Sequence, residues 1–94
     1  MGKKLHEKHT ELMQDAEYAR KFEEQQEEFN VARELIRARM QAGLTQQEVA
    51  QRMGTTQSVI ARMESGKPMP SLRSLKKYAQ ATGNKIKISF EADA

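Results

Sequence analysis

Four glycines divide the chain from residue 43 onward into segments too short for long helices. Gly43, Gly54, Gly66 and Gly83 interrupt a sequence in which apolar residues otherwise recur at helical spacing. Glycine adopts, without steric penalty, the left-handed backbone conformation that ends many helices. The pattern predicts three short helices, which lie at residues 46–53, 57–64 and 72–81.

Capping residues support these boundaries. Thr45 and Glu48 have the spacing of a capping box, in which a hydroxyl and a carboxylate each accept a hydrogen bond from a backbone N–H at the start of a helix. Ser71 stands where a side-chain oxygen can cap the third helix. We therefore expect helices to begin at Gln46 and Leu72.

Residues 46–64 meet the steric demands of a helix-turn-helix, in which two short helices cross at a steep angle. Ala50 is small where the helices would touch, and Gly54 permits the tight turn between them. An ordinary helical hairpin is the alternative, but it does not require small, glycine and apolar residues at these offsets. The residues expected to face inward and lock the pair are Val49, Met53, Ile60 and Met63.

The second helix of this pair leaves a mainly polar face for a partner. The residues of this face are Gln57, Ser58, Ala61 and Arg62. Glutamine can form two hydrogen bonds with adenine, arginine can do so with guanine, and alanine can contact the methyl group of thymine. The face therefore fits the major groove of DNA. For Arg62, a phosphate contact that carries no sequence information is the alternative.

Two segments, AGLTQQEVAQRMGTTQSVIARMESGK and PSLRSLKKYAQATG, resemble the Xre or Cro/repressor family of DNA-binding proteins. The resemblance implies that Thr56 caps the recognition helix, and that Gln46 and Lys67 contact phosphates. It also implies a partly buried ion pair between Arg39 and Glu64, which would join the preceding helix to the end of the recognition helix.

The charges are distributed unevenly about a net charge of +3. Residues 1–28 carry eight acids and five bases, whereas residues 29–94 carry eleven bases and five acids. A basic domain behind an acidic arm indicates two partners of opposite charge, with a solvated surface of accidental asymmetry as the alternative. An apolar stripe at helical spacing along the arm is formed by Leu12, Ala16, Ala19 and Phe22.

The arm, LHEKHTELMQDAEYARKFEEQQEEFNVARELIRAR, and the tail, GNKIKISFE, resemble antitoxins of the HigA type. The resemblance implies a protein that neutralises a RelE/HigB-like ribonuclease toxin and represses the operon that they share. Such toxins are expected to be basic because they act on RNA, which suits an acidic arm. The residues expected to contact the toxin are Leu12, Ala16, Tyr18, Ala19 and Phe22.

Two alternatives remain open for the arm. Tyr18 and Phe22 can instead pack on the protein's own core. The chain as a whole can instead be a free-standing repressor of the Xre family, in which the arm serves only dimerisation.

The tail from Lys85 to Phe90 alternates between polar and apolar residues, as strands do. A lone strand leaves its backbone N–H and C=O groups unpaired. We therefore expect the strand to pair with its copy across the two-fold axis of a homodimer. The side chains expected to form this dimer contact are Ile86, Ile88 and Phe90.

Several classes of function lack the residues that they need. The chain has no cysteine, and its two histidines, His6 and His9, have no third ligand nearby, so we expect no metal. No phosphate-binding loop or nucleophile–base pair appears, so we expect no enzyme, no cofactor and no small-molecule ligand. No apolar run is long enough to span a membrane, which predicts a soluble, cytoplasmic protein.

These patterns, together with the resemblance to the Xre or Cro/repressor family, predict an all-α fold. The resemblance implies a five-helix, lambda-repressor-like domain, to which the patterns add an N-terminal helical arm and one C-terminal β-strand. The predicted divisions are the arm at residues 1–28, the domain at 29–83 and the dimerisation tail at 84–94. The predicted core residues are Ala32, Leu35, Ile36, Met40, Leu44, Val49, Met53, Ile60, Met63, Leu72, Leu75 and Ala79.

Overall fold

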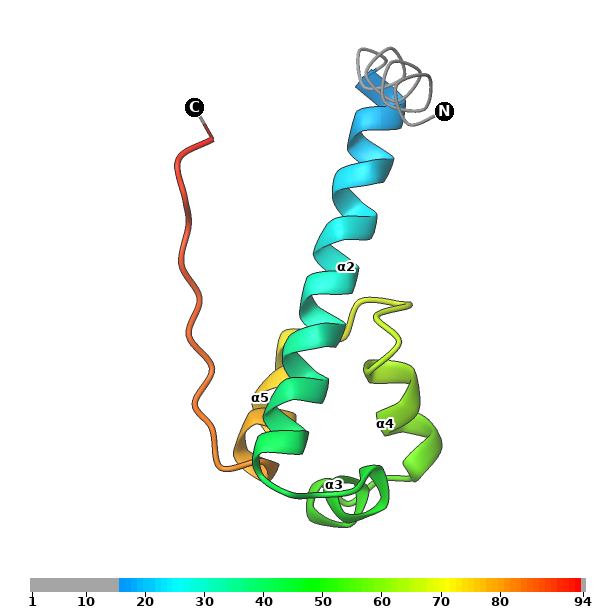
Figure 1. The fold of residues 1–94 in the computed structure, drawn as a ribbon, viewed down its shortest axis with the longest axis vertical. Coiled ribbons are helices and arrows are strands. Elements are labelled where there is room, and N and C mark those ends of the chain that lie inside the picture. The colour runs from blue at the N-terminus through cyan, green and yellow to red at the C-terminus, as the bar shows by residue number, and fades with distance from the viewer. Residues whose placement is uncertain (1–15, 94) are drawn as a thin grey trace, which may run out of the picture.

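The computed structural model describes residues 16–93, which contain four helices (Figure 1). The helices are α2 Ala16–Gln41, α3 Gln46–Met53, α4 Gln57–Met63 and α5 Leu72–Ala81. Helices α3, α4 and α5 gather around the C-terminal half of α2, and the N-terminal half of α2 projects beyond them. Residues 84–93 leave α5 and run alongside α2 without helical structure (Figure 1).

The expected C-terminal strand is wrong. The segment that carries Ile86, Ile88 and Phe90 forms no strand, and neither does any other part of residues 16–93. A β-ladder consists of hydrogen bonds between two strands. A segment of alternating polarity can pair in this way only if another extended segment lies beside it. The described part of the chain places no such segment beside the tail.

The expected count of five helices is also wrong for the described residues, which contain four. The prediction separated an arm helix from the first helix of the domain, whereas α2 is one helix of 26 residues that runs through residue 28. Its sequence contains neither glycine nor proline between Ala16 and Gln41, so nothing interrupts its hydrogen bonds. No described helix is both long enough and apolar enough to cross a membrane.

The predicted helix boundaries around the turn are confirmed. The Thr45 hydroxyl accepts a hydrogen bond from the Glu48 N–H, and the Glu48 carboxylate accepts one from the Thr45 N–H, each at 3.1 Å. The Ser71 hydroxyl caps α5 by accepting from Ser74 N–H at 3.1 Å. Gly54 ends α3 with φ 68°, in the left-handed region.

The core lies where α3, α4 and α5 meet the C-terminal half of α2. Val49, Ile60 and Tyr78 are fully buried at its centre. Its remaining buried members are Leu35, Ala50, Met63 and Ala81. All come from residue 35 or later, so the projecting half of α2 contributes nothing to this core.

Two predicted core residues lie at the surface. Met40 is 67% exposed and Leu72 is 46% exposed. Met40 follows Arg39, whose side chain faces the core, and successive residues on a helix are turned by about 100°. The helical pattern therefore gave α2 too wide an apolar face.

Candidate nucleic-acid interface

One face of α4 is open to solvent along its whole length. Gln57, Ser58, Ala61 and Arg62 are all exposed, and their spacing places them on neighbouring turns of one side. The opposite side is buried through Ile60 and Met63, which fastens the helix to the core. The exposed face is thus held by a rigid element.

The residues that flank this face lie at both ends of α4. Thr56 caps the helix, and its hydroxyl accepts a hydrogen bond from the Val59 N–H at 3.4 Å. Lys67 is exposed in the turn that follows α4. In this turn the Ser65 hydroxyl donates to the Arg62 carbonyl oxygen at 2.6 Å. Hydrogen bonds from side chains therefore hold the backbone at both ends of α4.

Sequence reasoning missed the partial exposure of one apolar residue at the edge of this face. Val59 is an apolar residue of α4 that remains 39% exposed. The available signal was its place on the helix surface, where its neighbours three and four residues on are the exposed Arg62 and the buried Met63. It adds an apolar group beside the polar ones and suits contact with a thymine methyl.

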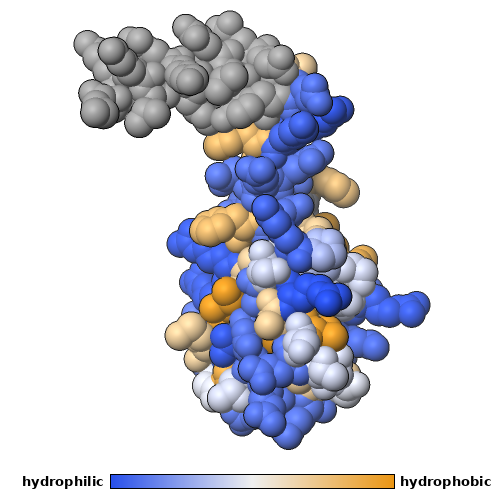
Figure 2. All heavy atoms as spheres, turned by 90° about the vertical axis from the view of Figure 1, so that its right-hand side faces the viewer, coloured by the Kyte–Doolittle hydropathy of each residue, from blue (hydrophilic) through white to orange (hydrophobic). Residues whose placement is uncertain are grey.

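The surface around α4 is mainly hydrophilic. Figure 2 views the molecule from the side that carries α4 and shows scattered apolar spots within a polar surface. Between residues 29 and 90 the sequence has eleven bases but only three acids, Glu34, Glu48 and Glu64. Glu64 is buried and paired with Arg39, so this pair carries no net charge, and Glu34 and Glu48 are the exposed acids that remain against ten other bases. Such a surface favours a polyanion.

The side chain of Glu64 forms a bidentate ion pair with Arg39. Arg39 Nε lies 2.8 Å from one carboxylate oxygen, and a terminal nitrogen of the same guanidinium lies 3.0 Å from the other. The two side chains are only 17% and 4% exposed. A third bond, from Arg39 to the carbonyl of Leu44 at 3.0 Å, joins the pair to the loop before α3.

Glu64 is ionised in this setting. Burial alone raises the pKa of its carboxyl, but hydrogen bonds from Arg39, Tyr78 and Gln46 outweigh burial and bring the pKa below its ordinary value. The hydrogen bond to Glu64 raises the pKa of Arg39 in turn. Each member of the pair therefore stabilises the ionised form of the other.

Tyr78 is a member of this cluster that sequence reasoning missed. Its hydroxyl lies 2.8 Å from Glu64 Oε2 and 2.7 Å from the carbonyl oxygen of Leu35. Burial first, and then the neighbouring Glu64, raise the pKa of Tyr78 far above its ordinary value, so the hydroxyl keeps its proton. The available signal was a tyrosine one turn after the apolar Leu75, because a buried hydroxyl needs a partner.

Gln46 connects the buried cluster to the exposed face. Its Nε2 donates to Glu64 Oε1 at 3.1 Å, and its Oε1 accepts from Gln57 Nε2 at 3.4 Å. Gln46 is half-buried at the first turn of α3, whereas Gln57 is exposed at the first turn of α4. Hydrogen bonds between polar side chains thus join the two helices of the helix-turn-helix, in addition to the apolar contacts of the core.

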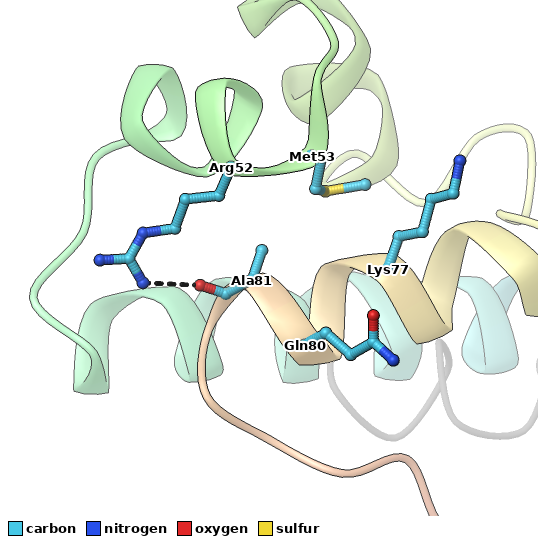
Figure 3. A pocket seen from close by; sticks show the side chains of 5 residues that line it. All are labelled: Arg52, Met53, Lys77, Gln80 and Ala81. Atoms are coloured by element: carbon cyan, nitrogen blue, oxygen red, sulfur yellow. Dashed lines mark hydrogen bonds between the residues drawn. The ribbon is translucent and has the colours of Figure 1, made fainter.

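A second surface feature is a hollow between α3 and α5, lined by Arg52, Met53, Lys77, Gln80 and Ala81 (Figure 3). Arg52 turns toward the end of α5 and donates to the carbonyl of Ala81 at 2.9 Å. The ammonium group of Lys77 points away from Arg52, and Met53 lies between them. The Arg52 contact stabilises the C-terminal end of α5, where carbonyl groups lack helical partners. No described group of acids and histidines could hold a metal.

Of the residues expected to contact a toxin, those that the structure describes lie on the projecting half of α2, away from this face. Ala16 is exposed and Ala19 and Phe22 are half-buried on the projecting half of α2. Tyr18 belongs to the same half of the helix, and Leu12 lies outside the described residues. In the tail, Ile86 is half-buried, whereas Ile88 and Phe90 are 61% and 98% exposed.

The fold and this face define a helix-turn-helix protein whose second short helix is free to enter a DNA groove. Comparison with protein families agrees, because the helix-turn-helix family model matches residues 35–87, more than half of the chain. The chain belongs to the Xre/Cro-like helix-turn-helix family and is a DNA-binding transcriptional regulator of the Xre type. Searches of curated proteins and of solved structures found no match.

Proposed function

We propose that this regulator is a repressor that reads operator DNA with the exposed face of α4. The observation that carries the proposal is a recognition helix whose buried side is locked into the core, while its open side offers donors, acceptors and no acid. Such a surface can discriminate base edges without rearranging.

Six residues of the interface have proposed roles. Gln57 and Ser58 contact base edges, with adenine the partner of Gln57. Arg62 pairs with guanine, and Ala61 contacts a thymine methyl. Gln46 and Lys67 bind phosphates on either side and set the register of the helix.

Binding to operators selected from random DNA tests these roles. Gln57→Ala and Arg62→Ala should each reduce discrimination at particular base pairs, by about 1–3 kcal/mol. Lys67→Ala should instead weaken binding to all sequences and reduce its salt dependence, because it removes one phosphate contact. An equal, sequence-independent loss in all three variants would contradict the proposed orientation of α4.

We further propose that the chain is an antitoxin that also neutralises a RelE/HigB-like ribonuclease. Support comes from the N-terminal half of α2, which projects beyond the domain and carries Glu23, Glu24 and Glu27 as exposed acids. The half-buried Ala19 and Phe22 lie on the same half of the helix. An acidic amphipathic helix of this kind suits a groove on a basic partner.

Binding to such a toxin, encoded beside this chain, tests this second role. Phe22→Ala should weaken the complex at least about tenfold, because buried aromatic residues dominate interface energies. Glu27→Lys should mainly slow association, as rim charges do. Glu34→Lys is the matched control, since it makes the same charge change on the domain half of α2. If no complex forms, the free-standing repressor is the better description.

A homodimer is the proposed form on DNA, with Ile86, Ile88 and Phe90 in the contact between copies. The exposure of Ile88 and Phe90 leaves apolar area that a second copy would cover. Two recognition helices could then meet major grooves one helical turn apart, about 34 Å. Replacing Ile88 and Phe90 by Asp should yield monomers in sedimentation, whereas the neighbouring control Ser89→Asp should not. Monomeric wild type would contradict this proposal.

A further inference from the structure

Four hydrogen-bond donors converge on the buried carboxylate of Glu64. Oε2 receives Arg39 Nε at 2.8 Å, and the Tyr78 hydroxyl at 2.8 Å shares its single proton between Oε2 and the carbonyl oxygen of Leu35, 2.7 Å away. Oε1 receives a terminal nitrogen of Arg39 at 3.0 Å and Gln46 Nε2 at 3.1 Å. These donors come from α2, α3 and α5, so the carboxylate that follows α4 is fixed by every other described helix.

The ionised state of Glu64 sets the direction of the next two hydrogen bonds. A carboxylate only accepts hydrogen bonds, so Gln46 must turn its NH₂ group toward Glu64. Its carbonyl oxygen then faces Gln57, which must donate its own Nε2. Gln57 is left with a free carbonyl oxygen and one free N–H, the acceptor and donor that pair with adenine.

We propose that Tyr78 is a positioning residue for DNA sequence recognition, acting through Glu64 and Gln46 on Gln57. The inference rests on the proposed reading of bases by Gln57. The Tyr78 hydroxyl is fully buried and contacts no residue of the exposed face. Its hydrogen bond holds the Glu64 carboxylate in one orientation. This orientation in turn fixes the orientation of the Gln46 side-chain amide.

Removing the hydroxyl should loosen this relay without emptying the core. Tyr78→Phe keeps the ring among Leu35, Val49 and Ile60, the residues that form the core with it. Glu64 Oε2 then keeps Arg39 as its only partner among these contacts. The carboxylate gains freedom to rotate, and with it the amides of Gln46 and Gln57.

The experiment compares the full-length wild type with Tyr78→Phe on two operators. One is the preferred operator, and the other has a changed base pair at the position identified by Gln57→Ala. Tyr78→Phe should lower the ratio of the two dissociation constants about five- to tenfold, a part of what one bidentate contact contributes. Ratios at the base pairs read by Arg62, and the salt dependence, should not change.

Thr82→Val is the matched control for loss of a buried hydroxyl. Thr82 is 6% exposed and donates to the Tyr78 carbonyl within α5, at 3.0 Å, and it makes no bond to Glu64. This variant should lower the melting temperature while leaving every ratio unchanged. Gln46→Met gives a second test at a half-buried position, because it breaks the relay downstream and should lower the same ratio.

The outcomes separate the inference from the proposed function. A Tyr78→Phe protein that is less stable but keeps the wild-type ratio would overturn the relay, as would an equal loss at all base pairs. Retention of the ratio by Gln46→Met would also overturn it. A wild type without base preference, or a Gln57→Ala variant that changes none, would overturn the proposed reading by α4 and the inference with it.

Discussion

At the level of single residues, Glu64 is the side chain that joins α2, α3 and α5 to the end of α4. A buried carboxylate is costly unless it is paired, and Glu64 is paired with Arg39 and bonded to Tyr78 and Gln46. The same side chain therefore ties together stability and the geometry of α4. Removing one partner of the pair should lower the free energy of unfolding strongly, because the other partner remains as a buried charge without a counter-charge.

Arg39→Met should destabilise the protein by about 3–5 kcal/mol, the range for removing one partner of a buried pair. Urea unfolding measures this loss. The double variant Arg39→Met with Glu64→Leu is the control, and it should recover much of the loss because no charge is left unpaired. A loss below about 1 kcal/mol for Arg39→Met would mean that the pair behaves as a surface pair.

The pKa directions in this cluster predict two limits of stability. The pKa of Glu64 lies below its ordinary 4.5, so its contribution is full above that pH and is lost as the pH falls further. The pKa of Tyr78 lies above its ordinary 10.0, so its contribution is full below pH 10.0 and is lost above it. Thermal melts of Tyr78→Phe should lose the alkaline decline and keep the acid one. An unchanged alkaline decline would contradict the assignment to Tyr78.

At the scale of elements, the turn after α4 is fitted tightly against α2. Gly66 has φ 75°, and a Cβ atom there would stand 2.5 Å from the carbonyl oxygen of Glu28. This close approach seats the segment with Lys67 beside the long helix. Gly54 has φ 68° as well, but a Cβ atom there would meet nothing within 4 Å.

The two glycines form a matched pair of variants. Gly54→Ala should cost about 1–2 kcal/mol, the penalty of the left-handed conformation alone. Gly66→Ala should cost more, above about 3 kcal/mol, because overpacking against the α2 backbone adds to that penalty. Equal losses in denaturant unfolding would mean that the turn can move away from α2 at little cost.

At the scale of the whole molecule, charge separates the two ends of α2. Helices α3, α4 and α5 gather around the C-terminal half of α2, while acids cluster on its projecting N-terminal half. Glu91 and Asp93 of the tail add to the same end, where they line a hollow with Phe22 and Glu27. The domain that faces DNA can thus be basic although the net charge of the chain is only +3.

A chain shortened to residues 24–94 should fold and bind operator DNA, because the buried residues of the described part begin at Ala32. Its melting temperature should change by only a few degrees, and its affinity for DNA should hold, since the removed residues carry five acids and five bases and include none of the proposed interface. Calorimetry and operator titration measure both. A large loss of stability would mean that the projecting half of α2 supports the domain.

The local features of this protein could be predicted from short stretches of its amino-acid sequence. The capping box at Thr45, the turn at Gly54 and the bounds of α3 and α5 agree with prediction because each is encoded by residues within a few positions of one another. The exposed side of α4 was also predictable, because a helical repeat separates Gln57 and Arg62 from Ile60.

The features that join residues distant in sequence became visible only once the helices were packed together. The alternating tail did not become a strand, because pairing requires a partner that local polarity cannot supply. Tyr78 meets the carbonyl of Leu35 across 43 residues of sequence, and Gly66 meets Glu28 across a turn and two helices. Such contacts depend on how the helices pack, and no short pattern records which groups packing brings together.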